Sequence, residues 1–379
     1  MFAIRWLIVA LFACLLQSAH PVCFAQPAKI EGRRSPEFKV GGTFRKFTPP
    51  DKSYNWRGAK THALQATVWY PAAPSAVEHP INIPGVSQIF VLGNGAEDAN
   101  LASTPAKFPM IVLSHGTGGS GLTMSWLATA LAAQGYIAVA VNHPGNNAPD
   151  GYTVQGFSTW WERARDLSVV IDSMLADPTF GRHIDSNRIG AAGFSLGGYT
   201  MIEIAGGVTD PEAFQQFCAS PRADGLCKSP PEFPTLLEDF EKLSKTDPEF
   251  QAALGHAGDS YRDPRVRAVF AMAPALGPAF HAASLATIAI PVRIVAGQSD
   301  ANVPIASSAK YFAANIPGAQ LTIFPGNVAH YVFLDSCTED GRKAKPLLCG
   351  DGEGVDRDAI HIKTAALAVE FFRATLKQK

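Results

Sequence analysis

Short apolar runs alternate with amphipathic segments along the chain from residue 108 onward. The segments between the runs repeat apolar residues every three to four positions, as amphipathic helices do. Strands that alternate with helices predict a mostly parallel sheet with helices on both faces. The expected strands are residues 110–113, 136–141, 188–194, 266–272, 291–296 and 320–324, and the expected helices begin near residues 124, 159, 196, 306 and 358.

Three regions depart from this alternation. Residues 64–70 are rich in β-formers and predict an antiparallel strand at the sheet edge, whereas the Pro- and Gly-rich residues 71–107 predict a surface loop. Residues 208–263 form an acidic, Pro-rich stretch after the helix that begins near residue 196. An insertion at this place is expected to be a helical and loop lid over a pocket, and a surface decoration is the alternative.

The N-terminus combines Arg5, an apolar run over residues 6–16 and small residues up to Ala25. This arrangement is typical of a secretory signal peptide over residues 1–25, because the apolar run is too short to span a bilayer comfortably. We therefore expect export to the periplasm or the extracellular space, with no stable membrane insertion after cleavage. The rest, residues 26–379, is expected to be a single domain. An uncleaved membrane anchor is the alternative.

Composition narrows the class of protein. The 379 residues are 47% hydrophobic and 17% charged, which is enough apolar material for a large core. The net charge is -1 and no long run of Lys or Arg occurs, so nucleic acid is not an expected partner.

Four cysteines remain beyond the N-terminal segment, and they lie in two close pairs. Cys218 and Cys227 form one pair, and Cys337 and Cys349 form the other. In an oxidising compartment this spacing suggests two local disulfides, although four cysteines allow three connectivities. A zinc site built from the same thiols is an alternative that the missing C-x-x-C spacing disfavours.

Candidate chemistry centres on the segment from Gly193 to Gly197. This G-x-S-x-G pattern lies between a predicted strand and a predicted helix, the context in which it places a nucleophilic serine on a sharp turn. Glycines are expected at both ends of the pattern because a Cβ there would collide with a neighbouring element. Ser195 is therefore the candidate nucleophile, and the N-terminus of the following helix faces the group that it attacks.

A serine hydroxyl needs a base within hydrogen-bond reach and a third group that orients the base. Asp300 and His330 each follow a predicted strand, so the sheet would bring both to the same edge as Ser195. Among the ten histidines, His330 is preferred because it lies in the loop between the last strand and the last helix. Asp335 is the rival acid, but it follows no strand. We therefore predict a catalytic triad of Ser195, His330 and Asp300.

The loop after the first parallel strand supplies a candidate oxyanion hole. It reads His115-Gly-Thr-Gly-Gly119, and the backbone N–H groups of Thr117 and Leu196 are expected to converge on a developing oxyanion. His115 and His143 are interpreted as structural hydrogen-bonding residues rather than bases. No metal site is expected.

Four motifs in register carry a family resemblance. They are Ser114-His-Gly-Thr-Gly118, Gly193-Phe-Ser-Leu-Gly-Gly198, Gly297-Gln-Ser-Asp300 and Ala329-His-Tyr-Val-Phe-Leu334. Across residues 105–375 the chain resembles the α/β-hydrolase branch called predicted dienelactone hydrolases, which is similar to secreted platelet-activating-factor acetylhydrolases. The resemblance implies an α/β-hydrolase fold and a cofactor-free serine ester hydrolase with the triad named above. True dienelactone hydrolases use a cysteine nucleophile, so the serine here favours a simpler carboxylic ester.

The expected function is an exported serine carboxylester hydrolase that acts on a small-molecule ester with a small or short acyl group. A polyester or cutinase-type hydrolase and a phospholipid acyl hydrolase are alternatives that would differ in pocket shape. A non-catalytic binding protein on the same fold is the alternative from another class, but a binding role would not require all three triad groups.

Overall fold

The computed structural model of the protein describes residues 36–82 and 88–377, and the predicted signal peptide over residues 1–25 lies outside them. The strands are β1 (Lys39–Phe47), β2 (Leu64–Ala72), β3 (His79–Pro80), β4 (Asn94–Glu97), β5 (Phe108–Ser114), β6 (Ile137–Val141), β7 (Asn146–Asn147), β8 (Gly151–Tyr152), β9 (Ile184–Phe194), β10 (Val266–Met272), β11 (Val292–Gly297) and β12 (Gln320–Phe324). The helices are α1 (Ser125–Ala132), α2 (Val154–Ser158), α3 (Glu162–Ala176), α4 (Leu196–Ala205), α5 (Pro211–Cys218), α6 (Leu236–Thr246), α7 (Pro248–Leu254), α8 (Ala282–Leu285), α9 (Ala309–Asn315), α10 (Glu339–Ala344), α11 (Pro346–Cys349) and α12 (Arg357–Thr375). The 3-10 helices are η1 (Gly121–Met124), η2 (Gly181–His183), η3 (Gly225–Cys227), η4 (Gly277–Ala279) and η5 (His330–Phe333).

Within the described residues, ten strands form one sheet in the order β12-β11-β10-β9-β5-β6-β2-β1-β4-β3. Neighbouring strands from β12 to β6 run parallel, whereas β2 runs antiparallel to both β6 and β1. The mostly parallel sheet and the antiparallel direction of β2 are confirmed. The expected edge position of β2 is wrong, because β1 and β4 continue the sheet beyond it.

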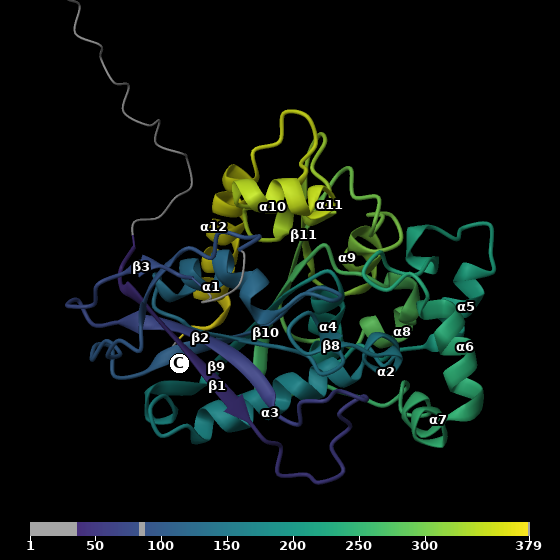
Figure 1. The fold of residues 1–379 in the computed structure, drawn as a ribbon, viewed down its shortest axis with the longest axis horizontal. Helices are drawn as coiled ribbons and strands as arrows, with labels where there is room; N and C mark the ends of the chain where they lie inside the picture. Colours follow the sequence, from purple (N-terminus) through teal and green to yellow (C-terminus); the bar gives the residue numbers. More distant parts are fainter. Residues whose placement is uncertain (1–35, 83–87, 378–379) are drawn as a thin grey trace, which may run out of the picture. The chain divides into compact units, whose positions relative to one another are not determined.

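Helices cover both faces of the sheet, as the alternation predicts. Helices α3, α4 and α9 pack on one face, and α1 and α12 pack on the other (Figure 1). The strand β5 shows how two cores arise, because Met110 and Val112 join the first core while Ile111 and Leu113 join the second. All four of these side chains are fully buried, so a central strand appears in the sequence as an unbroken apolar run.

The insertion over residues 208–263 carries α5, α6 and α7, which lie together at the right of Figure 1, away from α12. A buried cluster fixes its start to α4. The Tyr199 hydroxyl donates to Glu203 Oε1 at 2.6 Å, and the Thr209 hydroxyl also donates to this carboxyl group. The insertion therefore begins from a rigid point on the helix that follows Ser195.

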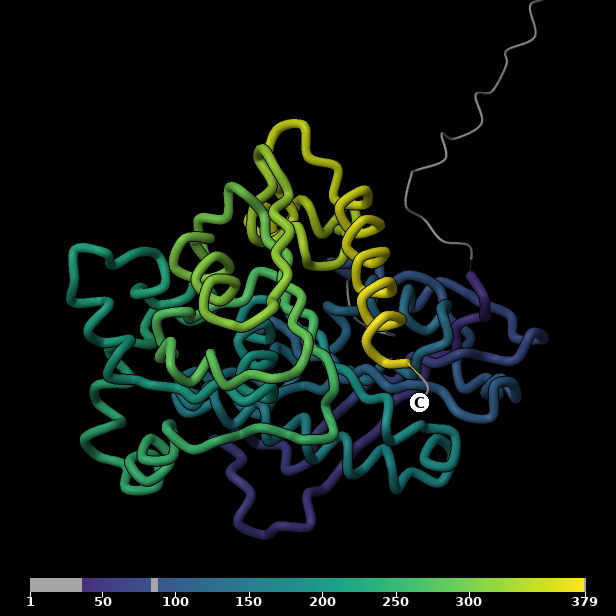
Figure 2. Tube along the Cα trace, turned by 180° about the vertical axis from the view of Figure 1, so that it is seen from behind, coloured from purple at the N-terminus to yellow at the C-terminus, as the bar shows by residue number. Residues whose placement is uncertain are grey.

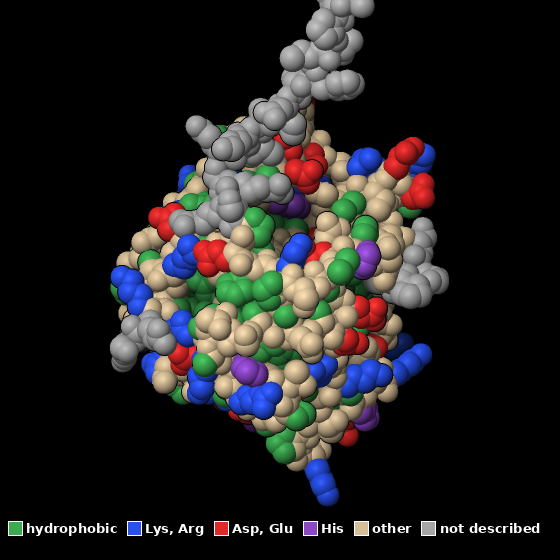
Figure 3. All heavy atoms as spheres, turned by 90° about the vertical axis from the view of Figure 1, so that its left-hand side faces the viewer, with side chains coloured by type: hydrophobic (Ala, Val, Ile, Leu, Met, Phe, Trp, Pro, Cys, Tyr) green, Lys and Arg blue, Asp and Glu red, His purple; other side chains and the backbone are tan. Residues whose placement is uncertain are grey.

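The end of α12 returns to the first described residues, as both ribbon and tube views show (Figures 1 and 2). Arg373 forms an ion pair there with Glu37. On the face drawn in Figure 3, Lys and Arg side chains are interspersed with Asp and Glu. Among residues 36–82 and 88–377, no helix has both the length and the apolar character needed to cross a membrane.

Both disulfides that the spacing suggests are present. Cys218 is bonded to Cys227, and Cys337 is bonded to Cys349. Their sulfur atoms are therefore not available as zinc-binding thiolates, which removes the zinc alternative. In the described part of the chain, no group of three or more His, Cys, Asp and Glu side chains is arranged to hold a metal ion.

Candidate active site

Ser195 lies on a sharp turn between β9 and α4, with φ 56° and ψ -116°. Residues with a Cβ rarely adopt a positive φ, so the surrounding packing must impose it. A Cβ at Gly197 would lie 1.9 Å from the Ser114 carbonyl oxygen, and a Cβ at Gly193 would lie 2.3 Å from the Gly197 carbonyl oxygen. Because these contacts are with backbone atoms, the turn closes only with glycine at both positions. The Ser195 N–H donates to the carbonyl oxygen of Met272 on β10 at 2.9 Å.

The side chains of Ser195, His330 and Asp300 form one hydrogen-bonded row. His330 Nε2 lies 2.9 Å from Ser195 Oγ, and His330 Nδ1 lies 2.6 Å from Asp300 Oδ2. The other oxygen of Asp300 accepts the backbone N–H of Val303 at 2.7 Å. All three side chains are buried, so water competes little for these hydrogen bonds. When Asp300 accepts a hydrogen bond from the N–H group at Nδ1, that nitrogen keeps its proton and Nε2 is left free to accept the serine proton.

The sheet order explains why these three groups meet. Ser195 follows β9, Asp300 follows β11 and His330 follows β12, and these strands run parallel with β10 between the first two. Their carboxyl ends therefore share one edge of the sheet. A Cβ at Gly297 would lie 2.4 Å from the Val328 carbonyl oxygen, so the end of β11 packs directly on the loop that leads to His330.

The loop after β5 runs past the candidate nucleophile. A Cβ on Gly116 would lie 3.3 Å from Ser195 Cβ and 3.1 Å from the Phe194 ring. Thr117 follows this close approach, and Leu196 is the first residue of α4. Leu196 is thus next to Ser195 in the sequence, and Thr117 lies in the loop that approaches Ser195 in space. Their role in an oxyanion hole stays a prediction.

Beneath this loop, Ser114, His143 and Asp166 form a second hydrogen-bonded row. Ser114 Oγ lies 2.9 Å from His143 Nε2, and His143 Nδ1 lies 2.6 Å from Asp166 Oδ2. Both oxygens of Asp166 also accept from Arg57 Nη2 at 2.8 Å. Burial, with the cationic Arg163 nearby, holds the pKa of His143 well below its usual value, so the imidazole is neutral. Because Ser114, His143 and Asp166 are fully buried, this row is structural rather than a second reaction site.

Arg163 joins the buried row to the loop beside Ser195. Its guanidinium donates to the carbonyl oxygen of His115, whose own Nδ1 lies 2.7 Å from the Gly116 carbonyl oxygen. Sequence reasoning missed Asp166, because a charged residue in an amphipathic helix usually faces solvent. It also missed Arg57, which lies in a turn between β1 and β2 and has no periodic pattern around it. The available signal was the spacing of Arg163 and Asp166, one helical turn apart on the apolar side of α3.

The rival acid Asp335 has a different task. Its Oδ1 atom accepts from the Ser125 hydroxyl and from the Trp126 N–H, both at 2.8 Å, so it anchors the start of α1. Burial raises the pKa of Asp335 to about 7. The imidazole of His361 likewise turns away from Ser195 and contacts the Val332 carbonyl oxygen at 2.7 Å.

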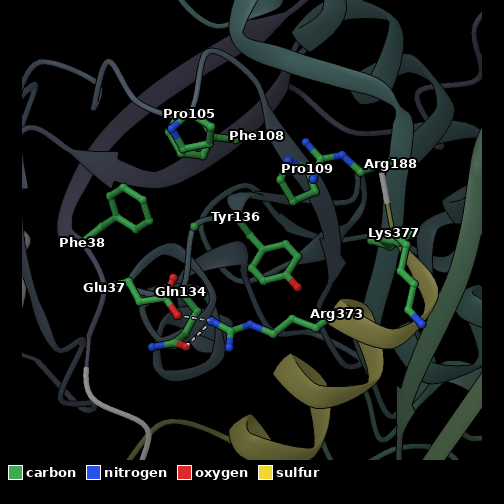
Figure 4. A pocket seen from close by; sticks show the side chains of 12 residues that line it. Glu37, Phe38, Pro105, Phe108, Pro109, Gln134, Tyr136, Arg188, Arg373 and Lys377 are labelled. Carbon is green, nitrogen blue, oxygen red and sulfur yellow. Dashed lines mark hydrogen bonds and ion pairs between the residues drawn. The ribbon is translucent and has the colours of Figure 1, made fainter. Parts of the chain in front are cut away.

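A separate pocket lies where β5 and β9 begin, at the opposite end of these strands from Ser195 (Figure 4). Phe108 at the start of β5, Arg188 of β9 and Arg373 of α12 line it. The extended strand from Arg188 to Ser195 is roughly 20 Å long, so this pocket is distinct from the site at Ser195.

Comparisons with known proteins agree with the fold. The model of the alpha/beta hydrolase family matches residues 111–340, a range that contains Ser195, Asp300 and His330. The solved structure of a ferulic acid esterase from Streptomyces cinnamoneus is similar with a TM-score of 0.57 and 20% sequence identity, covering 93% of this chain and 92% of that chain. A likeness at this identity shows the fold alone.

Two curated relatives match shorter segments. Lipase 1 from Moraxella sp. is 31% identical over 84 residues, which are 22% of this chain and 23% of the lipase. Dipeptidyl-peptidase 5 from Porphyromonas gingivalis is 30% identical over 114 residues, which are 26% of this chain and 15% of the peptidase. The chain therefore matches less than a quarter of the length of either relative.

Proposed function

Because the chain belongs to the alpha/beta hydrolase family, we propose that it is a serine hydrolase of carboxylic esters. The observation that carries this proposal is the hydrogen-bonded row from Ser195 through His330 to Asp300. A base at the serine hydroxyl and a carboxylate behind that base make the hydroxyl nucleophilic at neutral pH. The fold shared with a ferulic acid esterase and the short match to Lipase 1 support an ester as the substrate class.

In the first half of the reaction, His330 Nε2 takes the hydroxyl proton while Ser195 Oγ forms a bond to the acyl carbon. The negative charge that develops on the former carbonyl oxygen is stabilised by the backbone N–H groups of Thr117 and Leu196. The tetrahedral intermediate collapses when His330 gives its proton to the departing alkoxide. The alcohol leaves, and the acyl group stays bonded to Ser195.

In the second half, water gives a proton to His330 Nε2 and attacks the acyl carbon. Collapse of this intermediate returns the proton to Ser195 Oγ and releases the carboxylic acid. Asp300 keeps the imidazole in one tautomer and stabilises the imidazolium that forms in each half. The reaction thus ends with a free Ser195 hydroxyl and a neutral His330 imidazole, as it began.

Within the ester hydrolases, we propose a small ester with a short acyl group and a place near the dienelactone hydrolase-like branch. The four sequence motifs around Ser114, Ser195, Asp300 and His330 support this placement. A polyester or cutinase-type activity and a phospholipid acyl hydrolase activity are the alternatives. Rates on p-nitrophenyl esters from acetate to palmitate distinguish them, since a short-acyl enzyme loses activity as the chain lengthens.

We further propose that residues 208–263 act as a lid on a single domain over residues 26–379, and that residues 1–25 direct export. The two disulfides support an oxidising destination, because such bonds persist outside the reducing cytosol. Deletion of residues 236–254, which carry α6 and α7, should change the acyl-length preference if the insertion is a lid.

Turnover of p-nitrophenyl butyrate by the wild type and by Ser195→Ala tests the central proposal. We expect kcat to fall by about a thousandfold or more in the variant, because the nucleophile is lost. Equal turnover by both proteins would reject it and would favour the non-catalytic binding protein. Hydrolysis of butyryl p-nitroanilide but not of the ester would instead favour amide hydrolysis.

A further inference from the structure

One stretch of the insertion, residues 224–233, spans the two loops that flank Ser195. At its start, Asp224 Oδ2 accepts from the Ser307 hydroxyl at 2.5 Å, and a Cβ on Gly225 would lie 2.8 Å from the Ala301 carbonyl oxygen. Both contacts are with the segment that follows Asp300. We call residues 224–233 the crossing segment.

At its other end, the crossing segment meets the loop after β5. A Cβ on Gly118 would lie 3.0 Å from Glu232 Cγ, so the Glu232 side chain packs against the loop that contains Thr117. The next residue, Phe233, contacts the Phe157 ring edge-on with centroids 5.2 Å apart. The crossing segment is therefore anchored on both sides of the candidate active site.

The Glu232 carboxyl group lies beside the imidazole side of the site. Its Oε1 atom accepts from the hydroxyl of Tyr331, the residue after His330, at 3.3 Å. The Tyr331 hydroxyl is in turn contacted by the Asn302 amide at 3.2 Å. Partial burial raises the pKa of Glu232, and its electrostatic interaction with His330 opposes this effect.

No arginine or lysine in the described part of the chain forms an ion pair with Glu232. Its neutral partner Tyr331 cannot cancel the charge of an ionised carboxylate. The Glu232 carboxylate therefore acts on a group that binds at Ser195 beside the loop at Gly118 and the imidazole of His330. Because Glu232 is partly buried, a like charge beside it is repelled more strongly than it would be in bulk water.

We propose that Glu232 determines substrate specificity by placing a negative charge beside the candidate active site at Ser195 and His330. The protein then hydrolyses neutral and cationic esters in preference to esters that carry an anionic group near the scissile bond. This inference rests on the proposed ester hydrolysis at Ser195.

The test compares two p-nitrophenyl esters of similar length at pH 8, the anionic hemisuccinate and the neutral valerate. Glu232→Gln removes the charge and keeps the shape of the side chain. We expect kcat/KM for the hemisuccinate to rise roughly tenfold in this variant, from the removal of one like charge within several ångströms. The result is read as the ratio of the two kcat/KM values, so an effect of the lost charge on His330 that is common to both esters cancels.

Glu238→Gln is the matched control, because Glu238 is an exposed residue of α6 in the same insertion and the change in net charge is identical. The proposed role of Glu232 would be overturned if the ratio of the two kcat/KM values were unchanged in Glu232→Gln, or if it shifted equally in Glu238→Gln. Neither result would overturn the proposed ester hydrolysis. In that case turnover of the valerate by the wild type and its loss in Ser195→Ala would leave the ester hydrolase proposal intact. No turnover of either ester by the wild type would overturn both.

A second measurement uses the wild type only, so it does not depend on the folding of a variant. The trimethylammonio analogue of the butyrate ester adds a cationic substrate. The expected order of kcat/KM is cationic or neutral above anionic, and a preference for the anionic ester would contradict the proposal.

Discussion

At Ser195 the backbone conformation and the packing around it depend on each other. Positive φ at a residue with a Cβ costs of the order of 1–3 kcal/mol and persists only where the surroundings impose it. The close approach of Gly197 to the Ser114 carbonyl oxygen, and the hydrogen bond from Ser195 to Met272, impose it here. The serine hydroxyl is consequently aimed at His330 before any substrate binds.

Asp300→Asn should lower kcat on p-nitrophenyl butyrate by about 10³–10⁴-fold with little change in KM. An amide at this position favours the tautomer of His330 that carries its proton on Nε2, and that nitrogen then cannot accept the serine proton. Steady-state kinetics near pH 7.5 measures the effect.

Asp335→Asn is the comparison, because Asp335 is also a buried aspartate but anchors α1. We expect its kcat to stay within about threefold of the wild type while stability falls by about 1–3 kcal/mol. The opposite result, with activity lost in Asp335→Asn and kept in Asp300→Asn, would exchange the roles of the two residues.

Among the elements, the loop that carries η5, α10 and α11 begins at His330, and we expect it to hold this side chain in place. The disulfide between Cys337 and Cys349 closes this loop, and Cys337 also forms a β-bridge with Phe90. Arg357, at the start of α12, donates to the carbonyl oxygens of Asp335 and Leu348. Both ends of the loop are therefore tied to the same helix.

The double change Cys337→Ser and Cys349→Ser should lower stability by about 2–3 kcal/mol, because the open loop gains freedom in the unfolded chain. It should also lower kcat/KM, since Cys337 lies seven residues after His330. Thermal unfolding and ester turnover measure the two effects. If the unfolding temperature and the ester turnover of this variant both matched the wild type, the disulfide would have no role in holding His330. The double change Cys218→Ser and Cys227→Ser is the control, because it removes the other disulfide.

Elements whose position depends on local pattern were predictable from the sequence. The runs that became β5, β6 and β10 are apolar because both faces of these strands are largely buried. The place of β2 inside the sheet was not predictable, because it depends on β1 pairing with β2 on the side away from β6. The path of the crossing segment has no periodic signal, so Glu232 could not be assigned to the site.

The same distinction applies to the site. Ser195, Asp300 and His330 each follow a strand, and parallel order alone brings such positions together. The buried row of Ser114, His143 and Asp166 depends instead on how α3 packs against β5. The spacing of Arg163 and Asp166 marks a buried face of α3 but does not identify the partners of these residues.

For the molecule as a whole, buried carboxyl groups should make stability fall as pH rises. Burial raises the pKa of Glu203 to about 8, against an ordinary value of 4.5. Between these values the folded protein keeps a proton that the unfolded chain releases, so the free energy of unfolding decreases with pH. Asp335 contributes in the same direction, because burial raises its pKa to about 7.

Glu203→Gln should remove most of this slope. We expect the free energy of unfolding of the wild type to fall by roughly 4 kcal/mol more than that of the variant between pH 5 and pH 8. Urea unfolding at the two pH values provides the measurement, and the exposed Glu238→Gln serves as control. The part of the slope that is due to Asp335 should remain in Glu203→Gln. A slope in Glu203→Gln as steep as that of the wild type would assign the pH dependence to groups other than Glu203.

The meeting of Glu37 with Arg373 has a practical consequence for handling the protein. This ion pair borders the pocket at the start of β5 and β9, at the sheet edge opposite Ser195. A bead, electrode or affinity support coupled near the end of α12 would therefore hold the protein with Ser195 on the side away from the support. Immobilised preparations attached on this side should keep free diffusion of reactants to and from the candidate active site.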